Sequence, residues 1–413
     1  MTQQKHIAIL GAGPGGYVAA IRAAQFGARV TVVENQVLGG VCLNWGCIPS
    51  KALLAVVELG DKAKKAAELG LKLDGQVRYD MARMVTRKNK VVETLVKGIA
   101  TLFKTWGVEH LEGRGELLDE RTLRVAKRDG TEARVQADAI ILATGSSWPN
   151  LPLFPIDGRQ IITSKEALAG VEGCEFASLY GGIGTQVTMV ELMPRILPLE
   201  DEEISTFMDR ELKKRSVTIH VGTTVEKLER QNGAIKAILK DGTAIVAEKL
   251  LVSVGRGFNS KDIGLEQVGV QLGRRGEVLV SERLETNVPG VYAIGDLVGE
   301  AMLAHVASAQ GKVAVENILG HHREIRYNVI PAGIFTLPEI GRVGLTEQQA
   351  RERSQKSEAE IKIGRFRHIA LGKAHGVGDT TGLFKIIADA KTGAILGVHI
   401  IGAHAADLIH EAA

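Results

Sequence analysis

The sequence predicts an α/β protein with two doubly wound dinucleotide-binding domains, the second of them incomplete, and a smaller α+β domain at the end. Three observations lead to this prediction. The chain begins with a strand, a glycine-rich turn, a helix and a second strand that ends in an acidic residue. A shortened copy of the same order occurs near the middle of the chain. The tail, from about Pro331, has strand patterns of its own.

The first unit is an alternation of apolar runs and turn residues. Ile7–Leu10 is an apolar run typical of a buried strand. Tyr17–Phe26 is alanine-rich and helical, with Gly27 placed to end the helix. Arg29–Val33 is rich in β-branched residues and closes with Glu34. These segments predict a β-α-β unit.

The later elements follow in chain order. The sequence predicts an interrupted helical stretch over Lys51–Phe103, a strand at Ala139–Ala143, a helix at Phe176–Tyr180, strands at Val187–Val190 and Leu250–Val254, a return segment at Val291–Asp296, a helix at Met302–Leu319, and strands at Gly382–Ala388 and Ala394–Ile401. Three of the ten prolines cluster in residues 148–155 and mark a change of module. We expect four parts: a first dinucleotide-binding domain (1–147), a second one (148–257), a central segment that completes the first (258–330), and an interface domain (331–413).

Composition argues against several classes of function. With 45% hydrophobic and 24% charged residues, the chain is typical of globular proteins. The net charge of +3 is spread thinly without a polybasic block, so nucleic acid is not an expected partner. No apolar run reaches the roughly 20 residues that span a bilayer, and the first strand begins almost at once. We therefore expect no membrane association, no targeting peptide and a cytoplasmic location.

A glycine-rich turn, Gly11-Ala12-Gly13-Pro14-Gly15-Gly16, follows the first strand and opens the first helix, which is the context of a G-x-G-x-x-G site. Gly11 permits the tight turn, Gly13 lets the backbone approach a pyrophosphate, and Gly16 allows close helix–strand packing. Glu34 would accept hydrogen bonds from ribose hydroxyls and repel a 2′-phosphate. A purely structural glycine turn is the alternative, and the flanking strand, helix and acid disfavour it. The motif itself is compatible with FAD and with NAD.

Two of the three cysteines, Cys42 and Cys47, lie just past this unit and near the expected cofactor. A regular helix places residues five apart on different faces, but an irregular turn at Gly46 would bring the sulfurs together. A zinc site needs four ligands, and no second Cys or His pair with suitable spacing follows. Inert core cysteines remain an alternative, although a close pair in a reducing compartment is more often catalytic or metal-binding.

The stretch Gly39–Lys51, GGVCLNWGCIPSK, closely resembles the active-site signature of class I pyridine nucleotide-disulfide oxidoreductases, and the resemblance extends over essentially the whole chain. The stretches 143–146 (ATGS), 293–296 (AIGD) and 302–305 (MLAH) are similar to further FAD contacts of the family. The tail is similar to its dimer-forming interface domain. The resemblance implies a homodimer that holds FAD at Gly11, Gly13, Pro14, Gly15, Gly16, Glu34, Gly39, Gly40, Val41, Lys51, Gly115, Thr144, Gly145, Ser146, Asp296, Met302, Leu303, Ala304 and His305.

The resemblance also implies a reaction. A dihydrolipoyl dithiol, carried by an acyltransferase component of a 2-oxo acid dehydrogenase complex, would attack a disulfide at Cys42. Cys47 would be released against the flavin and pass electrons into it, and the reduced flavin would give hydride to NAD+. Lys51 would lie near the flavin N5 edge, with Glu175 as its partner. A plain surface lysine is the alternative for Lys51.

The second nucleotide fold departs from the family pattern. Its helix, its following strand and an acid are present, and the resemblance implies NAD contacts at Gly173, Glu191 and Gly255. Between Leu168 and Cys174 only five residues remain, too few for a first strand and its glycine turn. Losing a central strand leaves backbone groups unpaired, at about 1–3 kcal/mol each. We therefore expect either an internal gap in the sequence or impaired NAD binding.

Two further readings concern the same region. The run Gly181-Gly182-Ile183-Gly184 resembles a replacement glycine motif, but it follows the helix, so we interpret it as a helix-ending turn. If the site is otherwise whole, Glu191 predicts NAD in preference to NADP.

The end of the sequence is the other departure. The family continues beyond the position of Ala413 and there carries a His-x-x-x-x-Glu pair, whose histidine is the acid–base catalyst across the dimer interface. His410 and Glu411 are adjacent, so we assign neither as catalytic. We expect a C-terminally truncated interface domain without the catalytic base.

Three functions stay open from the sequence. The first is NAD-linked oxidation of dihydrolipoyl groups. The second is a related FAD disulfide reductase with another substrate, such as a glutathione-like or mercuric one; an arginine-bearing NADP pattern, which would favour it, is missing after the second strand of the NAD fold. The third is a catalytically impaired FAD-binding remnant, which the two departures favour. No metal site is expected.

Overall fold

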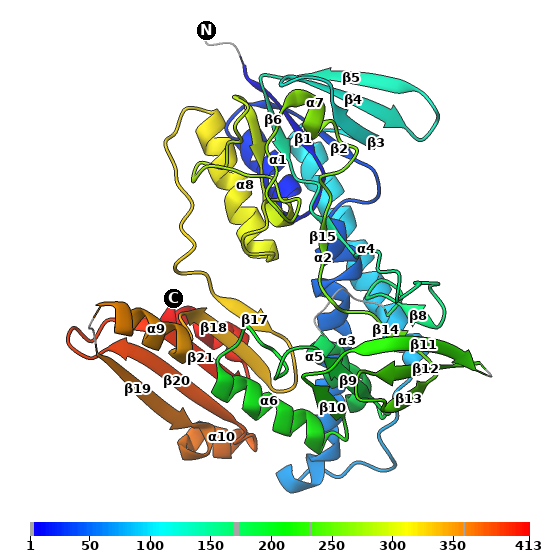
Figure 1. Cartoon of the computed structure of the whole chain (residues 1–413), viewed down its shortest axis with the longest axis vertical. Helices are drawn as coiled ribbons and strands as arrows, with labels where there is room; N and C mark the ends of the chain where they lie inside the picture. The colour runs from blue at the N-terminus through cyan, green and yellow to red at the C-terminus, as the bar shows by residue number, and fades with distance from the viewer. Residues whose placement is uncertain (1–3, 168–172, 232, 358–359) are drawn as a thin grey trace.

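The computed structural model describes residues 4–167, 173–231, 233–357 and 360–413 (Figure 1). A nucleotide-binding fold lies at one end of the molecule, and a smaller α/β part and a C-terminal sheet lie together at the other end. Helices α3 and α4 run between the two ends. The predicted α/β fold class is confirmed.

A seven-stranded sheet forms the centre of the first fold. Its strands are β1 (His6–Leu10), β2 (Arg29–Glu34), β3 (Glu109–Leu117), β4 (Thr122–Lys127), β5 (Glu132–Gln136), β6 (Ala139–Leu142) and β16 (Val291–Ala293). The strand order is β16-β6-β1-β2-β3-β4-β5. Neighbours from β16 to β3 are parallel, whereas β3, β4 and β5 are antiparallel. Because β16 pairs with β6, a segment from late in the chain completes the first sheet.

Helices cover this sheet and reach toward the rest of the molecule. They are α1 (Pro14–Gln25), α2 (Gly40–Trp45), α3 (Cys47–Lys64), η1 (Ala66–Leu69), α4 (Met81–Thr105), α7 (Leu265–Val268), η2 (Gly295–Val298) and α8 (Ala304–Ile318). Small side chains let α1 and α8 approach closely: a Cβ on Gly311 would lie 2.7 Å from the oxygen of Gly15. The predicted helical stretch over Lys51–Phe103 is interrupted as expected, because residues 70–80 between η1 and α4 are not helical. Its first helix begins earlier than predicted, at Cys47.

The middle of the chain forms several small sheets. Its elements are β7 (Ser146–Ser147), β8 (Ile161–Ile162), α5 (Gly173–Gly182), β9 (Thr188–Glu191), α6 (Glu202–Lys214), β10 (Thr218–Val221), β11 (Val225–Gln231), β12 (Ala234–Leu239), β13 (Ala244–Ala247), β14 (Leu250–Leu251) and β15 (Gly257–Phe258). Strands β9 and β10 form one parallel pair and β8 and β14 another. In the described ranges no strand joins the two pairs. The predicted missing strand would fall on residues 168–172, which lie outside the described residues.

Two expectations for this part have clear outcomes. The predicted strand Leu250–Val254 is shorter than expected, because the ladder covers only β14 and the backbone turns at Gly255, whose φ is +104°. The helix-ending turn is confirmed. Helix α5 ends at Gly182, and Gly184 donates its N–H to the oxygen of Gly181 in a left-handed conformation with φ of +96°.

The C-terminal part is a five-stranded antiparallel sheet in the order β17-β18-β21-β20-β19, with short helices around it. Its elements are β17 (Ala332–Ile334), β18 (Glu339–Gly344), α9 (Glu347–Ser357), β19 (Ile361–Arg367), η3 (His368–Ala370), α10 (Gly372–Val377), β20 (Gly382–Asp389), β21 (Ile395–Gly402), α11 (Ala405–Leu408) and η4 (Ile409–Ala412). His410 and Glu411 lie in η4.

One stretch of the described chain, Gly40–Lys64, has the length and apolar composition of a membrane-crossing helix. In the structure this stretch is α2 and α3, interrupted at Gly46. Leu53, Leu54 and Val57 from it are buried in a core with side chains of α4 and α5. We therefore interpret this stretch as helices that pack on the protein core, which can have the same length and apolar composition as a membrane-crossing helix.

A buried lysine ties the middle of the chain to the C-terminal sheet. Lys385 of β20 is 2% exposed, and its Nζ lies 2.7 Å from Asp201 Oδ1 and 2.8 Å from Glu347 Oε2. Asp201 also accepts the N–H groups of Glu203 in α6 and of Glu347, the first residue of α9, each at 3.0 Å. Burial alone would raise the pKa of Asp201, but its bonds to Lys385 and Glu347 outweigh burial and hold that pKa below its usual value.

Replacing Lys385 by methionine is expected to lower the free energy of unfolding by about 3–5 kcal/mol, because Asp201 would stay charged in a buried place without its cation. Urea titration followed by circular dichroism measures the loss. Lys362→Met, on an exposed position of β19, is the matched control and should change stability by less than about 0.5 kcal/mol. A loss at Lys385 no larger than at Lys362 would show that the cluster does not stabilise the fold.

The same pair predicts how this stabilisation depends on pH. The pKa of Asp201 is lowered, so its contribution is present above the usual value of about 4 and is lost as the pH falls through the folded pKa. Burial lowers the pKa of Lys385, but hydrogen bonds to Asp201 and Glu347 outweigh burial and raise it. Its contribution is full below about pH 10.4 and is lost as the pH rises through the folded pKa. The stability gap between Lys385 and its methionine variant should therefore shrink at both extremes.

Candidate functional site

One cleft of about 2320 Å³ gathers most of the residues that the sequence singled out. It runs from the glycine turn of the first fold, past the two cysteines, to the middle part of the chain. Gly16, Gly39 and His305 do not line it. The predicted site residues that line the cleft are Gly11, Gly13, Pro14, Gly15, Glu34, Gly40, Val41, Cys42, Cys47, Lys51, Gly115, Thr144, Gly145, Ser146, Gly173, Glu175, Glu191, Gly255, Asp296, Met302, Leu303 and Ala304.

The glycine turn has no room for side chains. Gly11 has a φ of +106°, and a Cβ there would lie 2.3 Å from the oxygen of Ala143 on the neighbouring strand end. A Cβ on Gly16 would lie 1.9 Å from the oxygen of Gly11, so Gly16 is needed for packing although it does not touch the cleft. Gly13 precedes α1, and no side chain caps that helix. The helix N-terminus therefore faces the cleft as an anion-binding end, which suits a pyrophosphate.

Glu34 closes β2 at the edge of the same turn. It is 9% exposed, its Oε2 accepts the N–H of Ala12 at 2.8 Å, and its Oε1 accepts the N–H of Gln36 at 2.8 Å. Two backbone donors thus fix the carboxylate, which lines the cleft and can accept further hydrogen bonds. With the glycine cradle, this arrangement fits the adenosine and pyrophosphate of the flavin dinucleotide that the resemblance implies.

An arginine that the sequence did not single out lies farther along the cleft. Arg256 donates its Nε–H to Ser146 Oγ at 2.6 Å, and Ser146 Oγ donates to Asp296 Oδ2 at 2.5 Å. The Arg256 guanidinium also lies 5.3 Å from the centre of the Trp148 ring. Burial lowers the pKa of Arg256, and the charge of Asp296 partly offsets this. The only sequence signal for Arg256 was its position next to Gly255, because its partners Ser146 and Asp296 lie far away in the chain.

Cys42 and Cys47 form a disulfide, with their Cα atoms 4.8 Å apart. The predicted irregular turn explains it. Helix α2 ends at Trp45, Gly46 leaves the helical conformation with φ of −135° and ψ of −118°, and α3 begins at Cys47. A Cβ on Gly46 would lie 2.9 Å from the Cα of Cys42, so glycine lets the two helices close on each other.

Lys51 lies one helical turn after Cys47 in α3. Its Nζ stands 3.4 Å from the centre of the Phe335 ring. Burial lowers the pKa of Lys51, against the opposing charges of Glu175 and Glu339. Lys51 is thus not the plain surface lysine of the alternative reading. Glu175, 5% exposed in α5, accepts the N–H of Phe335 at 2.6 Å.

The middle part of the chain holds the residues expected to contact NAD. Gly173 is the first residue of α5, Glu191 ends β9 and accepts the N–H of Met193 at 2.7 Å, and Gly255 has φ of +104°. The acid and the helix start needed for an adenosine ribose are therefore present. The stretch just before Gly173, residues 168–172, where the sequence predicts a missing strand and glycine turn, lies outside the described residues. The described part fits only one end of NAD.

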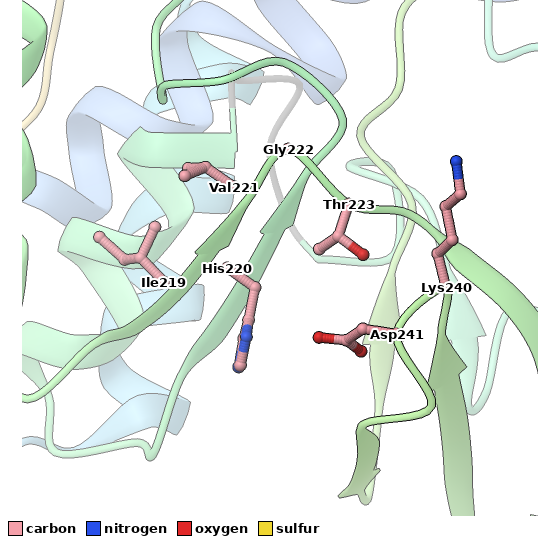
Figure 2. Close-up of a pocket in the computed structure, with 7 residues that line it drawn as sticks. All are labelled: Ile219, His220, Val221, Gly222, Thr223, Lys240 and Asp241. Carbon is pink, nitrogen blue, oxygen red and sulfur yellow. The ribbon is translucent and has the colours of Figure 1, made fainter.

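A smaller pocket of about 610 Å³ lies away from the cysteines, between β10 and the turn after β12 (Figure 2). The Asp241 carboxylate is turned toward His220, whereas Lys240 points away from the pocket. Its lining has neither a cysteine nor a glycine cradle. We therefore do not assign disulfide or dinucleotide chemistry to this pocket. Across the described ranges no three His, Cys, Asp or Glu side chains gather as a metal site.

Two family models match the chain. Residues 5–311 match pyridine nucleotide-disulphide oxidoreductase, and residues 330–413 match the dimerisation domain of the same group, which supports a homodimer. The chain is 39% identical to a dihydrolipoyl dehydrogenase of Chlorobaculum tepidum, covering 100% of this chain and 90% of that protein. It is 38% identical to the mitochondrial dihydrolipoyl dehydrogenase of Pisum sativum, covering 100% of this chain and 85% of that protein.

Structure comparison agrees with the sequence matches. The chain is similar to the crystal structure of LpdA from Mycobacterium tuberculosis with a TM-score of 0.90 and 27% identity, covering 98% of this chain and 92% of that one. The alignment with the pea protein extends over 432 positions, more than the 413 residues of this chain. That relative therefore carries residues that have no counterpart here.

Proposed function

Because the chain belongs to the pyridine nucleotide-disulphide oxidoreductase family, we propose that it oxidises dihydrolipoyl groups to lipoyl disulfides, with FAD and NAD+ as cofactors. The observation that carries the proposal is the Cys42–Cys47 disulfide, which lines the same cleft as the dinucleotide cradle. Dihydrolipoyl dehydrogenases that match over the full chain support the choice of substrate.

The helices around the disulfide support distinct roles for its two sulfurs. Cys47 is the first residue of the 18-residue helix α3, whereas Cys42 lies inside the short helix α2. A thiolate at a helix N-terminus is stabilised and has a lowered pKa, and the better leaving thiolate is expelled faster. A substrate thiolate therefore attacks Cys42 and releases Cys47. The second substrate thiol then displaces Cys42, which leaves a lipoyl disulfide, two reduced cysteines and one electron pair stored in the protein.

The cleft residues hold the cofactors and set charge. Glu34 and the turn at Gly13 would hold the adenosine end of FAD, and Asp296 would hold its ribityl or phosphate region. FAD, when bound, takes the electron pair from the reduced cysteines and delivers it to NAD+. Lys51 places a desolvated positive charge one turn from Cys47, which favours the Cys47 thiolate. Glu191 holds the ribose of NAD+.

The proposal also names partners and a location. The dithiol is carried on the lipoyl group of an acyltransferase, and the working unit is a homodimer, as the dimerisation-domain match supports. We place the protein in the cytoplasm; bacterial relatives such as that of Chlorobaculum tepidum support this location, whereas the Pisum sativum relative is a mitochondrial protein. For the four-part division of the chain at 147, 257 and 330, the pairing of β16 with β6 is the supporting observation.

An anaerobic titration tests the function. FAD-loaded protein mixed with dihydrolipoamide should lose its flavin absorbance and gain the long-wavelength thiolate–flavin band within seconds. NAD+ added next should restore the oxidised spectrum. Equal or faster reduction by glutathione would support the related reductase instead. Bound FAD that neither dithiol nor glutathione reduces would identify the chain as a binding remnant.

A further inference from the structure

Three separate parts of the chain meet at Lys51. Lys51 belongs to α3 of the first fold, Glu175 belongs to α5 of the middle part, and Phe335 follows β17 of the C-terminal sheet. All three line the cleft beside Cys47. Helix α5 also packs against the C-terminal sheet, because Cys174 and Ala177 share a buried core with Ile340. At Lys51 itself, the segment after β17 makes the junction.

Phe335 contacts both charged groups, each by a different part of the residue. Its ring face covers the ammonium of Lys51, with Nζ 3.4 Å from the ring centre. Its backbone N–H is donated to Glu175 Oε1 at 2.6 Å. The ring attracts a cation over its face and keeps water from it. Phe335 thus fixes the ammonium on one side and the carboxylate on the other.

The same segment has a second anchor that does not reach Lys51. Two residues later, Leu337 donates its N–H to Ser178 Oγ at 3.3 Å, and Ser178 is fully buried in α5. Both Phe335 and Leu337 also pack against a core that contains Leu53 and Phe176. The segment is therefore held in place independently of the ring's contact with Lys51.

We propose that Phe335 is a positioning residue that holds the Lys51 ammonium beside the redox disulfide, and that the C-terminal sheet thereby sets the charge at the reacting sulfurs. The inference rests on the proposed function, because it concerns the thiolate released at Cys47. Cys47 and Lys51 are spaced by four on α3 and so lie on one helix face. A cation held there favours the Cys47 thiolate, whereas a lysine free to swing into solvent does so less.

The test compares three variants of the full-length, FAD-loaded protein. Phe335→Leu removes the ring but keeps an apolar side chain and the N–H to Glu175. Phe335→Tyr keeps the ring. Ser178→Ala removes the neighbouring anchor and leaves the ring on Lys51. In each protein, the long-wavelength band after dithiol reduction is followed against pH. The pH dependence of iodoacetamide alkylation at Cys47, mapped by mass spectrometry on reduced flavin-free protein, gives a readout without the cofactor.

We expect Phe335→Leu to move both midpoints to higher pH by about half a unit to one unit, since a nearby cation shifts a pKa on this scale. Phe335→Tyr should restore them to within about 0.2 units of the parent, and Ser178→Ala should leave them unchanged. An unchanged midpoint in Phe335→Leu overturns the proposal, as does an equal shift in Ser178→Ala, which would point to loosening of the segment. If the parent protein shows no band, the proposed function fails, and the alkylation midpoints still decide the role of Phe335.

Discussion

Replacing Cys47 by serine is expected to reduce turnover with dihydrolipoamide and NAD+ by at least about a thousandfold, as removal of a covalent-catalysis nucleophile does elsewhere. The electron pair enters the protein only by opening the Cys42–Cys47 disulfide, and a lone thiol at Cys42 cannot store two electrons. Stopped-flow spectroscopy should show that dithiol no longer reduces the flavin and that the long-wavelength band does not form.

The Cys42→Ser and Cys47→Ser variants should differ in when the long-wavelength band appears. Cys42→Ser leaves Cys47 as a permanent thiol at the start of α3, so the long-wavelength band should be present before any dithiol is added. Cys174→Ser provides a matched control, because Cys174 is a buried cysteine outside the disulfide. In the Cys174→Ser variant, the long-wavelength band should still form only after dithiol is added. Formation of the band by the Cys47→Ser variant would contradict the assignment of this sulfur.

The parts of the site that are local in sequence were predictable. The turn at Gly11–Gly16 and the acid at Glu34 lie within one β-α-β unit, and their conformations are dictated by steric limits that a few residues carry. The break at Gly46 was also readable, because two residues five apart cannot meet on an unbroken helix. For such features the spacing itself contains the geometry.

The features that join distant segments were not predictable. Phe335 reaches Glu175 across 160 residues of chain, and Lys385 reaches Asp201 across 184. Neither pair has a local spacing that signals it, because the contact exists only after separate parts have packed. Lys385 stands between apolar residues in β20, and the strand pattern does not indicate which acidic residue it pairs with. Contacts of charged groups between distant segments therefore could not be predicted from the sequence.

The second large effect concerns NAD+. We expect the KM for NAD+ to be at least about tenfold higher than in the Chlorobaculum tepidum relative assayed alongside, a loss of about 1.4 kcal/mol of binding. Glu191 is in place, but β9 and β14 belong to separate two-stranded sheets in the described chain. When no sheet joins these two strand pairs, Glu191 and the start of α5 at Gly173 are not held in a fixed orientation relative to each other. Reduction of the flavin by dihydrolipoamide does not use the NAD+ site, so Glu191→Ala should leave its rate within about threefold of the parent.

Two variants separate a loose nucleotide site from an intact one. Glu191→Ala should raise the KM for NAD+ by less than about threefold here, whereas in an assembled site the same change removes a buried charge-assisted hydrogen bond worth tenfold or more. Inserting a β-strand and a G-x-G-x-x-G turn between Ala167 and Gly173 should lower the KM for NAD+ and restore the full effect of Glu191→Ala. If the parent chain already binds NAD+ as tightly as the relative, and Glu191→Ala weakens that binding tenfold, then the sheet is joined without the added strand. The two strand pairs would in that case be sufficient to hold both the ribose and the pyrophosphate, because a tight site requires that Glu191 and the helix start be fixed relative to each other.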